Sequence, residues 1–129
     1  MKEDFAITME SDKPFDTVVA NIEENVPKHQ FRVLAVHDVQ ATLEEKGLDL
    51  EPLKIIEVCN AKFAHQALHR EGDVALFMPC RYAVYERAGK TTVKLARPSV
   101  ISAMLPEAEL ENLAGEVEET LKKIMRESI

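Results

Sequence analysis

Cysteine and glycine are scarce in this sequence, and their scarcity excludes several classes of protein. Two cysteines among 129 residues cannot form the dense framework of a disulfide-stapled secreted domain. Four glycines supply neither a phosphate-binding P-loop nor a dinucleotide-binding motif, and no serine stands in a Gly-x-Ser-x-Gly turn. No apolar run approaches the roughly 20 residues of a membrane-spanning helix. Nucleotide-binding enzymes with these loops, serine hydrolases of that type and membrane-spanning proteins are therefore not expected.

The charge balance and the first residues also restrict the partners and the location. Sixteen Lys and Arg residues stand against 23 Asp and Glu residues, which gives a net charge of −7. That acidic balance argues against binding to nucleic acid or to an anionic membrane surface. Residues 1–5 contain three charged side chains and lack the apolar core of a secretory signal. We therefore expect a cytoplasmic protein with no nucleic-acid or membrane partner.

Hydrophobic patterning predicts one α+β domain over residues 1–129. Hydrophobic residues make up 46% of the chain and charged residues 30%, which is typical of a globular protein. Alternating or continuous apolar segments predict strands, and apolar residues at helical spacing predict helices. The expected strands are residues 5–9, 31–37, 53–59, 81–87 and 91–96. The expected helices are residues 14–26, 39–46, 61–70, 98–105 and 106–127.

The order of these elements predicts a two-layer sandwich. The order reads β-α-β-α-β-α-β-β-α-α, and no repeat or long linker divides it. We expect a single mixed β-sheet packed with helices. Tyr82 and Tyr85, in the last predicted hairpin, suit either the core or a seam between two copies of the chain.

Five segments, taken in order, resemble one protein family. They read Pro-Phe-Asp-Thr-Val from residue 14, Gln-Phe-Arg-Val-Leu-Ala-Val-His-Asp from 30, Gly-Leu-Asp-Leu from 47, Ile-Ile-Glu-Val-Cys-Asn from 55 and Met-Pro-Cys-Arg from 78. With the hairpin that leads to Pro98, they resemble the bacterial and archaeal domain-of-unknown-function family 302 over residues 5–101. The resemblance implies a compact α+β domain that often pairs into dimers. It implies no established activity.

The sequence departs from the family pattern at two places, and both involve cysteine. Many members have Gly-Asn-Pro where this chain has Cys59-Asn60-Ala61, and many have Leu-Pro-Leu where it has Met78-Pro79-Cys80. The chain therefore resembles a subgroup of the family in which both positions are cysteine.

These two cysteines are the first candidate site. Cys59 ends a predicted strand directly before a helix, and a helix N-terminus stabilises a neighbouring thiolate. Cys80 opens the strand after that helix, so the sheet can bring both thiols to one end. Two thiolates and an imidazole suit a thiophilic metal such as zinc, copper or iron, and the thiols alone suit a dithiol–disulfide pair. The alternative is that both cysteines are small apolar core residues.

Three histidines are candidates to complete such a site. His65 lies in the helix after Cys59, and His69 is its i+4 neighbour on the same helical face. Because Gln66 follows His65, the His-Glu-x-x-His box of zinc proteases is absent, and two solvated histidines are the simpler interpretation. His37 ends a predicted strand, and Asp38 after it is expected to cap the next helix rather than to pair with it.

The sequence thus leads to two hypotheses and to no reaction. The first is a small cytoplasmic module, paired as a homodimer, that binds a metal or works as a thiol redox pair through Cys59 and Cys80, with His65, His37 or His69 as a further ligand. The alternative is a non-catalytic ligand-binding or interaction domain in which both cysteines are core residues. A hydrolase or transferase would need a nucleophile–base pair, and the sequence points to none.

Overall fold

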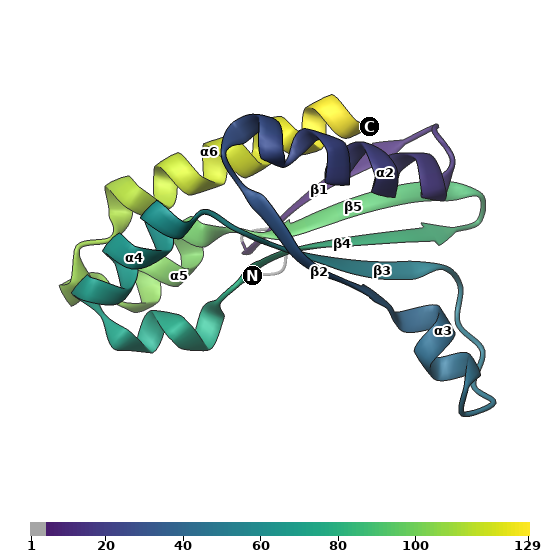
Figure 1. Ribbon diagram of the computed structural model, residues 1–129, viewed down its shortest axis with the longest axis horizontal. Helices are drawn as coiled ribbons and strands as arrows, with labels where there is room; N and C mark the ends of the chain where they lie inside the picture. Colours follow the sequence, from purple (N-terminus) through teal and green to yellow (C-terminus); the bar gives the residue numbers. More distant parts are fainter. Residues whose placement is uncertain (1–4) are drawn as a thin grey trace.

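Five strands form one sheet, and two long helices cover one of its faces (Figure 1). The computed structural model describes residues 5–129. The strands are β1 (Ala6–Ser11), β2 (Arg32–Asp38), β3 (Leu53–Cys59), β4 (Cys80–Arg87) and β5 (Lys90–Ala96). The helices are α2 (Phe15–Asn25), α3 (Val39–Glu44), α4 (Ala61–Arg70), α5 (Pro98–Met104) and α6 (Glu111–Ser128), with 3-10 turns η1 (Pro27–His29), η2 (Gly72–Phe77) and η3 (Pro106–Ala108).

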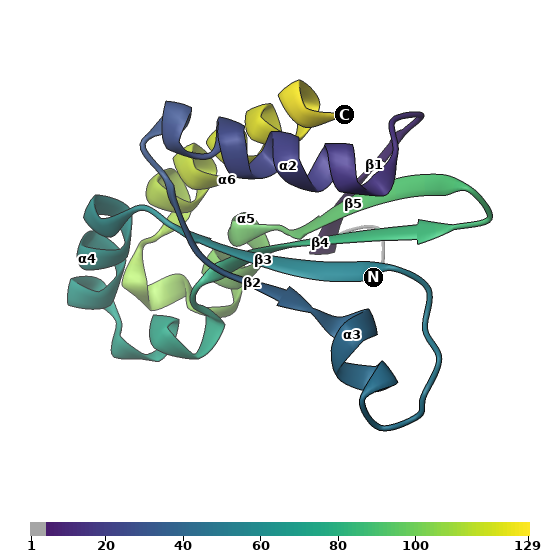
Figure 2. The ribbon, with the colours of Figure 1, turned by 45° about the vertical axis from the view of Figure 1, so that its right-hand side comes forward.

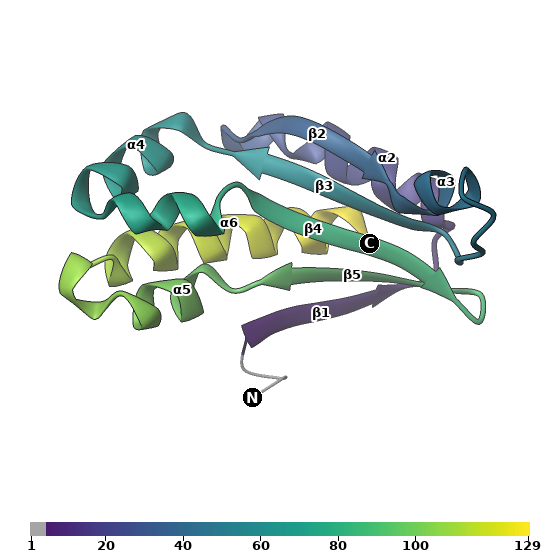
Figure 3. The same cartoon turned by 90° about the horizontal axis from the view of Figure 1, so that it is seen from below.

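The sheet has the order β1-β5-β4-β3-β2, and the predicted α+β sandwich with its order of elements is confirmed. The expectation of a mixed sheet is corrected, because all four neighbouring pairs are antiparallel. The chain does make one parallel crossover, from β1 through α2 to β2. Those two strands lie at opposite edges of the sheet with three strands between them, so they never pair (Figure 3).

The final helix is shorter than the sequence predicts. Residues 106–127 were expected to form one helix, but the structure has η3, then a break, then α6 from Glu111. The break occurs at Glu109, whose φ of 54° lies in the left-handed region and cannot continue a right-handed helix. Within residues 5–129, no helix combines the length and the hydrophobicity needed to cross a bilayer.

The core fills the space between the sheet and the pair α2 and α6. Because side chains alternate along a strand, every second residue of β4 and β5 faces these helices. Tyr82 is the largest fully buried side chain of the protein, so it belongs to the core and not to a seam between copies. Around it pack the apolar stripes of the two helices, which include Val18, Val19, Ile22, Leu121, Ile124 and Met125.

In the part of the chain that the structure describes, no helix lies over the centre of the opposite face of the sheet (Figure 3). Figure 2 shows α3 projecting from the end of β2, on the far side of the sheet from α2 and α6. The side chains across the middle of this open face are Ile55, Ala83 and Lys94, which lie opposite one another in neighbouring strands. They are partly buried although no helix covers them.

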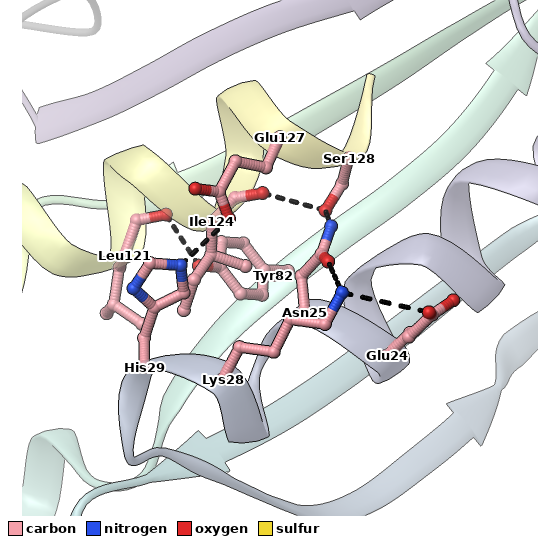
Figure 4. Close-up of polar contacts among 9 residues, drawn as sticks. All are labelled: Glu24, Asn25, Lys28, His29, Tyr82, Leu121, Ile124, Glu127 and Ser128. Atoms are coloured by element: carbon pink, nitrogen blue, oxygen red, sulfur yellow. Dashed lines mark hydrogen bonds and ion pairs between the residues drawn. The ribbon is translucent and has the colours of Figure 1, made fainter.

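Polar contacts fix α6 in place on its neighbours (Figure 4). The Tyr82 hydroxyl donates a buried hydrogen bond of 2.6 Å to the Leu121 carbonyl oxygen. At the end of the helix, Asn25 Nδ2 donates to Ser128 Oγ at 3.1 Å, and His29 Nε2 lies 2.8 Å from Glu127 Oε1. Burial raises the pKa of Tyr82, so its hydroxyl keeps the proton that it donates.

The hydrogen bond from Tyr82 to α6 gives the first prediction. Tyr82→Phe keeps the buried ring but removes the donor, and we expect a loss of about 1–1.5 kcal/mol in the free energy of unfolding. Urea denaturation measures this loss. Tyr85→Phe is the matched control, because Tyr85 lies on the open face of the same strand and is only partly buried, and it should cost less than about 0.5 kcal/mol. Equal effects of the two substitutions would contradict the assigned role of Tyr82.

Candidate functional site

A pocket of about 100 Å³ lies at one end of the sheet, where β3 ends and β4 begins. In Figure 1 this is the end at which α4, η2 and α5 gather around the first half of α6. The wall is almost wholly apolar. Its residues are Phe31, Val58, Cys59, Asn60, Phe63, Ala64, Ala67, Val74, Phe77, Met78, Pro79, Cys80, Pro98, Ile101, Ser102, Leu110, Leu113, Ala114 and Val117.

The pocket lies where two hydrophobic clusters meet. The larger cluster is the core between the sheet and the two long helices, and Val58 and Val117 belong to it. The smaller cluster consists of Val74, Leu110 and Leu113. Phe63 packs against both clusters, and the pocket is lined from both of them. Interiors are normally close-packed, so an open space at such a junction is a notable feature of the structure.

Both cysteines line this pocket as free thiols. In the antiparallel pairing of β3 and β4, Val58 lies opposite Cys80, and Cys59 is the next residue along β3. The two cysteines therefore lie at the same end of the sheet on neighbouring strands. Because side chains alternate along β3, Cys80 shares the face of Val58, whereas Cys59 is directed to the other face.

The thiols are protonated at neutral pH, contrary to the thiolate that the sequence led us to expect at Cys59. Burial raises the pKa of Cys59 above its usual 9.0. Burial raises the pKa of Cys80 to about 11. The charge that Cys59 carries once it ionises adds to this rise, and the positive charge of Arg81 opposes it. At the N-terminus of α4 the capping residue is Asn60, whose Oδ1 accepts from the Phe63 amide at 3.0 Å, so this amide is not free to stabilise a thiolate at Cys59.

The histidines occupy two other places. His65 and His69 lie on the exposed side of α4, with their Nε2 atoms 3.1 Å apart. Other residues of that helix line the pocket, namely Phe63, Ala64 and Ala67. No histidine is among the residues that line the pocket.

His37 lies on the open face of the sheet, on the edge strand β2. Its Nε2 is 3.4 Å from Glu57 Oε1, and the other carboxylate oxygen of Glu57 is 3.6 Å from Arg81 Nε. Asp38 caps α3, as predicted, by accepting from the Ala41 amide at 2.9 Å. His37 is therefore part of a surface ion-pair group.

The five predicted metal ligands are thus divided among three places. Over residues 5–129, no three His, Cys, Asp or Glu side chains are grouped so that they could hold one metal ion. A structural zinc site needs four ligands and a catalytic one needs three from the protein, whereas the pocket offers two thiols. The residues present do not complete such a site.

The sequence reasoning missed most of the pocket wall. No element was predicted between the helix 61–70 and the strand 81–87, but Gly72–Phe77 forms the 3-10 turn η2, and Val74 and Phe77 in it line the pocket. The three-residue spacing of these two apolar side chains was the available signal, since one 3-10 turn places them on the same side. The contributions of α5 and α6 had no local signal.

The comparisons with known proteins agree with the fold. No curated protein matches the chain. A solved structure of an uncharacterized conserved DUF302 protein from Bacillus stearothermophilus is similar, with a TM-score of 0.91, 28% identity, and coverage of 97% of this chain and 98% of that one. The sequence profile of the domain of unknown function DUF302 matches residues 7–128, so it includes α6, which the resemblance seen in the sequence did not reach. The chain belongs to the DUF302 family.

Proposed function

We propose that the protein is a binding module for a small apolar ligand and that the pocket under α4 is its binding site. The observation that carries this proposal is the almost wholly apolar wall of the pocket. An apolar protein cavity of about 150 Å³ stays free of water and accepts benzene or xenon. The volume here is about 100 Å³, so it suits a small ring, a short alkyl group or the end of a longer chain.

The two cysteines support binding more than they support catalysis. A protonated thiol packs as a small apolar side chain, and the raised pKa values of Cys59 and Cys80 keep both thiols in that form. The only polar side chains in the wall, Asn60 and Ser102, are engaged elsewhere. Asn60 caps α4, and the Ser102 hydroxyl donates to the Ser99 carbonyl oxygen at 2.8 Å.

A substitution that fills the pocket tests this proposal. In Ala67→Leu the added methyl groups enter the pocket from α4, and we expect benzene binding to weaken by roughly tenfold or more. Benzene titration followed by methyl-resolved NMR measures binding, with saturable shifts expected at Val74 and Leu113. Ala61→Leu is the matched control, because Ala61 is exposed on the same helix and does not line the pocket.

Two results would overturn the proposal. One is a wild-type protein whose pocket signals do not shift, or shift without saturation. The other is an Ala67→Leu variant that remains folded and binds benzene as the wild type does.

A dithiol–disulfide pair is the second candidate function, favoured by two free cysteines that end and begin neighbouring strands and are both among the residues that line the pocket. In that reaction each thiol loses a proton, the two sulfurs form one bond, and two electrons reduce an external disulfide to two thiols. This candidate needs an attacking thiolate, which the burial of both cysteines disfavours.

Thiol kinetics separate the two candidates. At pH 8, a pKa of about 11 leaves about 0.1% of Cys80 ionised, compared with about 10% of a thiol at 9.0, so Cys80 should react about 100-fold more slowly than a free thiol. An aromatic disulfide reagent measures the rates, and Cys59→Ser isolates the reaction of Cys80. Rapid loss of about two mass units with oxidised dithiothreitol would instead support the redox pair.

The raised pKa of Cys80 also predicts how stability depends on pH. The folded state keeps this thiol protonated, so its contribution is complete below the unfolded pKa of 9.0 and falls as the pH rises toward about 11. From about pH 8 to about pH 10.5, the difference in unfolding free energy between wild type and Cys80→Ala should shrink by about 2 kcal/mol. Urea denaturation across that range is the measurement. A constant difference would contradict the burial of this thiol.

Pairing with a second copy and a cytoplasmic location stay predictions. The open sheet face, with Ile55 and Ala83 at its centre, is the surface on which we expect a second copy to pack.

A further inference from the structure

The His65–His69 pair on the outer side of α4 is a second feature that the pocket does not use. The two residues are one helical turn apart, both are exposed, and their ring centroids lie 4.4 Å apart. Their Nε2 atoms face each other at 3.1 Å, so that one Nε2–H donates to the other Nε2. Two imidazoles therefore direct the same ring nitrogen toward a common point at the surface.

We propose that His65 and His69 bind one divalent transition-metal ion through their Nε2 atoms. Bonds from imidazole nitrogen to such ions are about 2.0–2.1 Å long, and at that length nitrogens 3.1 Å apart subtend an angle of about 100° at the metal. This angle lies between that of square-planar or octahedral sites and that of tetrahedral ones. The rings thus hold almost the spacing of two adjacent ligands.

Metal binding at this pair requires a change of tautomer in one ring, and no proton has to leave the pair. In the metal-free pair, one Nε2 carries the hydrogen and the other accepts it. When the metal binds, the donor ring takes the tautomer with its hydrogen on Nδ1, so both Nε2 lone pairs become available to the ion and the rings turn slightly to direct them at it. Since both side chains are exposed, water fills the remaining coordination positions.

The donor set selects the class of metal. Two imidazoles suit copper, nickel and zinc, and the affinity order for such nitrogen sites places Cu²⁺ above Ni²⁺ and Zn²⁺. Mg²⁺ and Ca²⁺ prefer oxygen ligands, and over residues 5–129 no carboxylate is grouped with the pair as a third ligand. The site is separate from the pocket, because Phe63, Ala64 and Ala67 line the pocket from another side of α4.

Titration with Ni²⁺ tests the proposal, because Ni²⁺ does not oxidise the free thiols of the pocket. We expect one Ni²⁺ per chain by calorimetry, and paramagnetic broadening of NMR signals centred on His65 and His69. His65→Gln and His69→Gln should each weaken binding by about 10- to 100-fold, since each converts a chelate into a single ligand. Cys59→Ser with Cys80→Ser, and separately His37→Gln, should leave it unchanged.

A variant with the same number of histidines provides the sharpest control. His69→Gln combined with Gln66→His leaves two histidines at i and i+1, which do not face each other on a helix. It should bind Ni²⁺ as weakly as His69→Gln does. Wild-type affinity in any of the three His65 or His69 variants, broadening centred on another histidine, or a wild-type protein that does not bind Ni²⁺ would overturn the proposal.

Discussion

Val58 lies opposite Cys80 in the antiparallel pairing of β3 with β4, and this register determines where the strand residues of the pocket wall lie. It places the last residue of β3 beside the first residue of β4, so both thiols reach the same end of the sheet. The chain leaves β3 at this end through α4 and returns through η2, which means that one connection supplies one side of the pocket. A shift of β4 by one residue along β3 would turn Cys80 to the opposite face of the sheet, away from Val58.

The environment of the thiols, rather than their position in the sequence, determines their chemistry. Cys59 stands just before a helix, which favours a thiolate on its own. Asn60 takes the helix amide instead, and the apolar wall removes the water that would solvate a charge. Burial raises the pKa of both thiols, and the same residues that suggested metal or redox chemistry form part of an apolar surface.

Local signals in the sequence predicted most of the fold and little of the site. The elements were found because the alternation in β5 and the helical spacing in α6 are local patterns, as are the caps Asp38 and Asn60. The antiparallel sheet was not found, because the distance between β1 and β2 is a property of the whole topology. The i, i+4 spacing was enough to predict that His65 and His69 lie on the same face of one helix. The position of the histidines relative to the cysteines depends on long-range packing, which no local pattern shows.

The pocket itself follows from side-chain size. Ala64 and Ala67 on α4 and Ala114 on α6 line it, and all three are the smallest side chains that still favour a helix. Alanine at these positions leaves space between the two helices that a larger side chain would fill. The same helix presents these alanines on one side and the histidine pair on another, so the small side chains that open the pocket leave the outer surface of α4 to other chemistry.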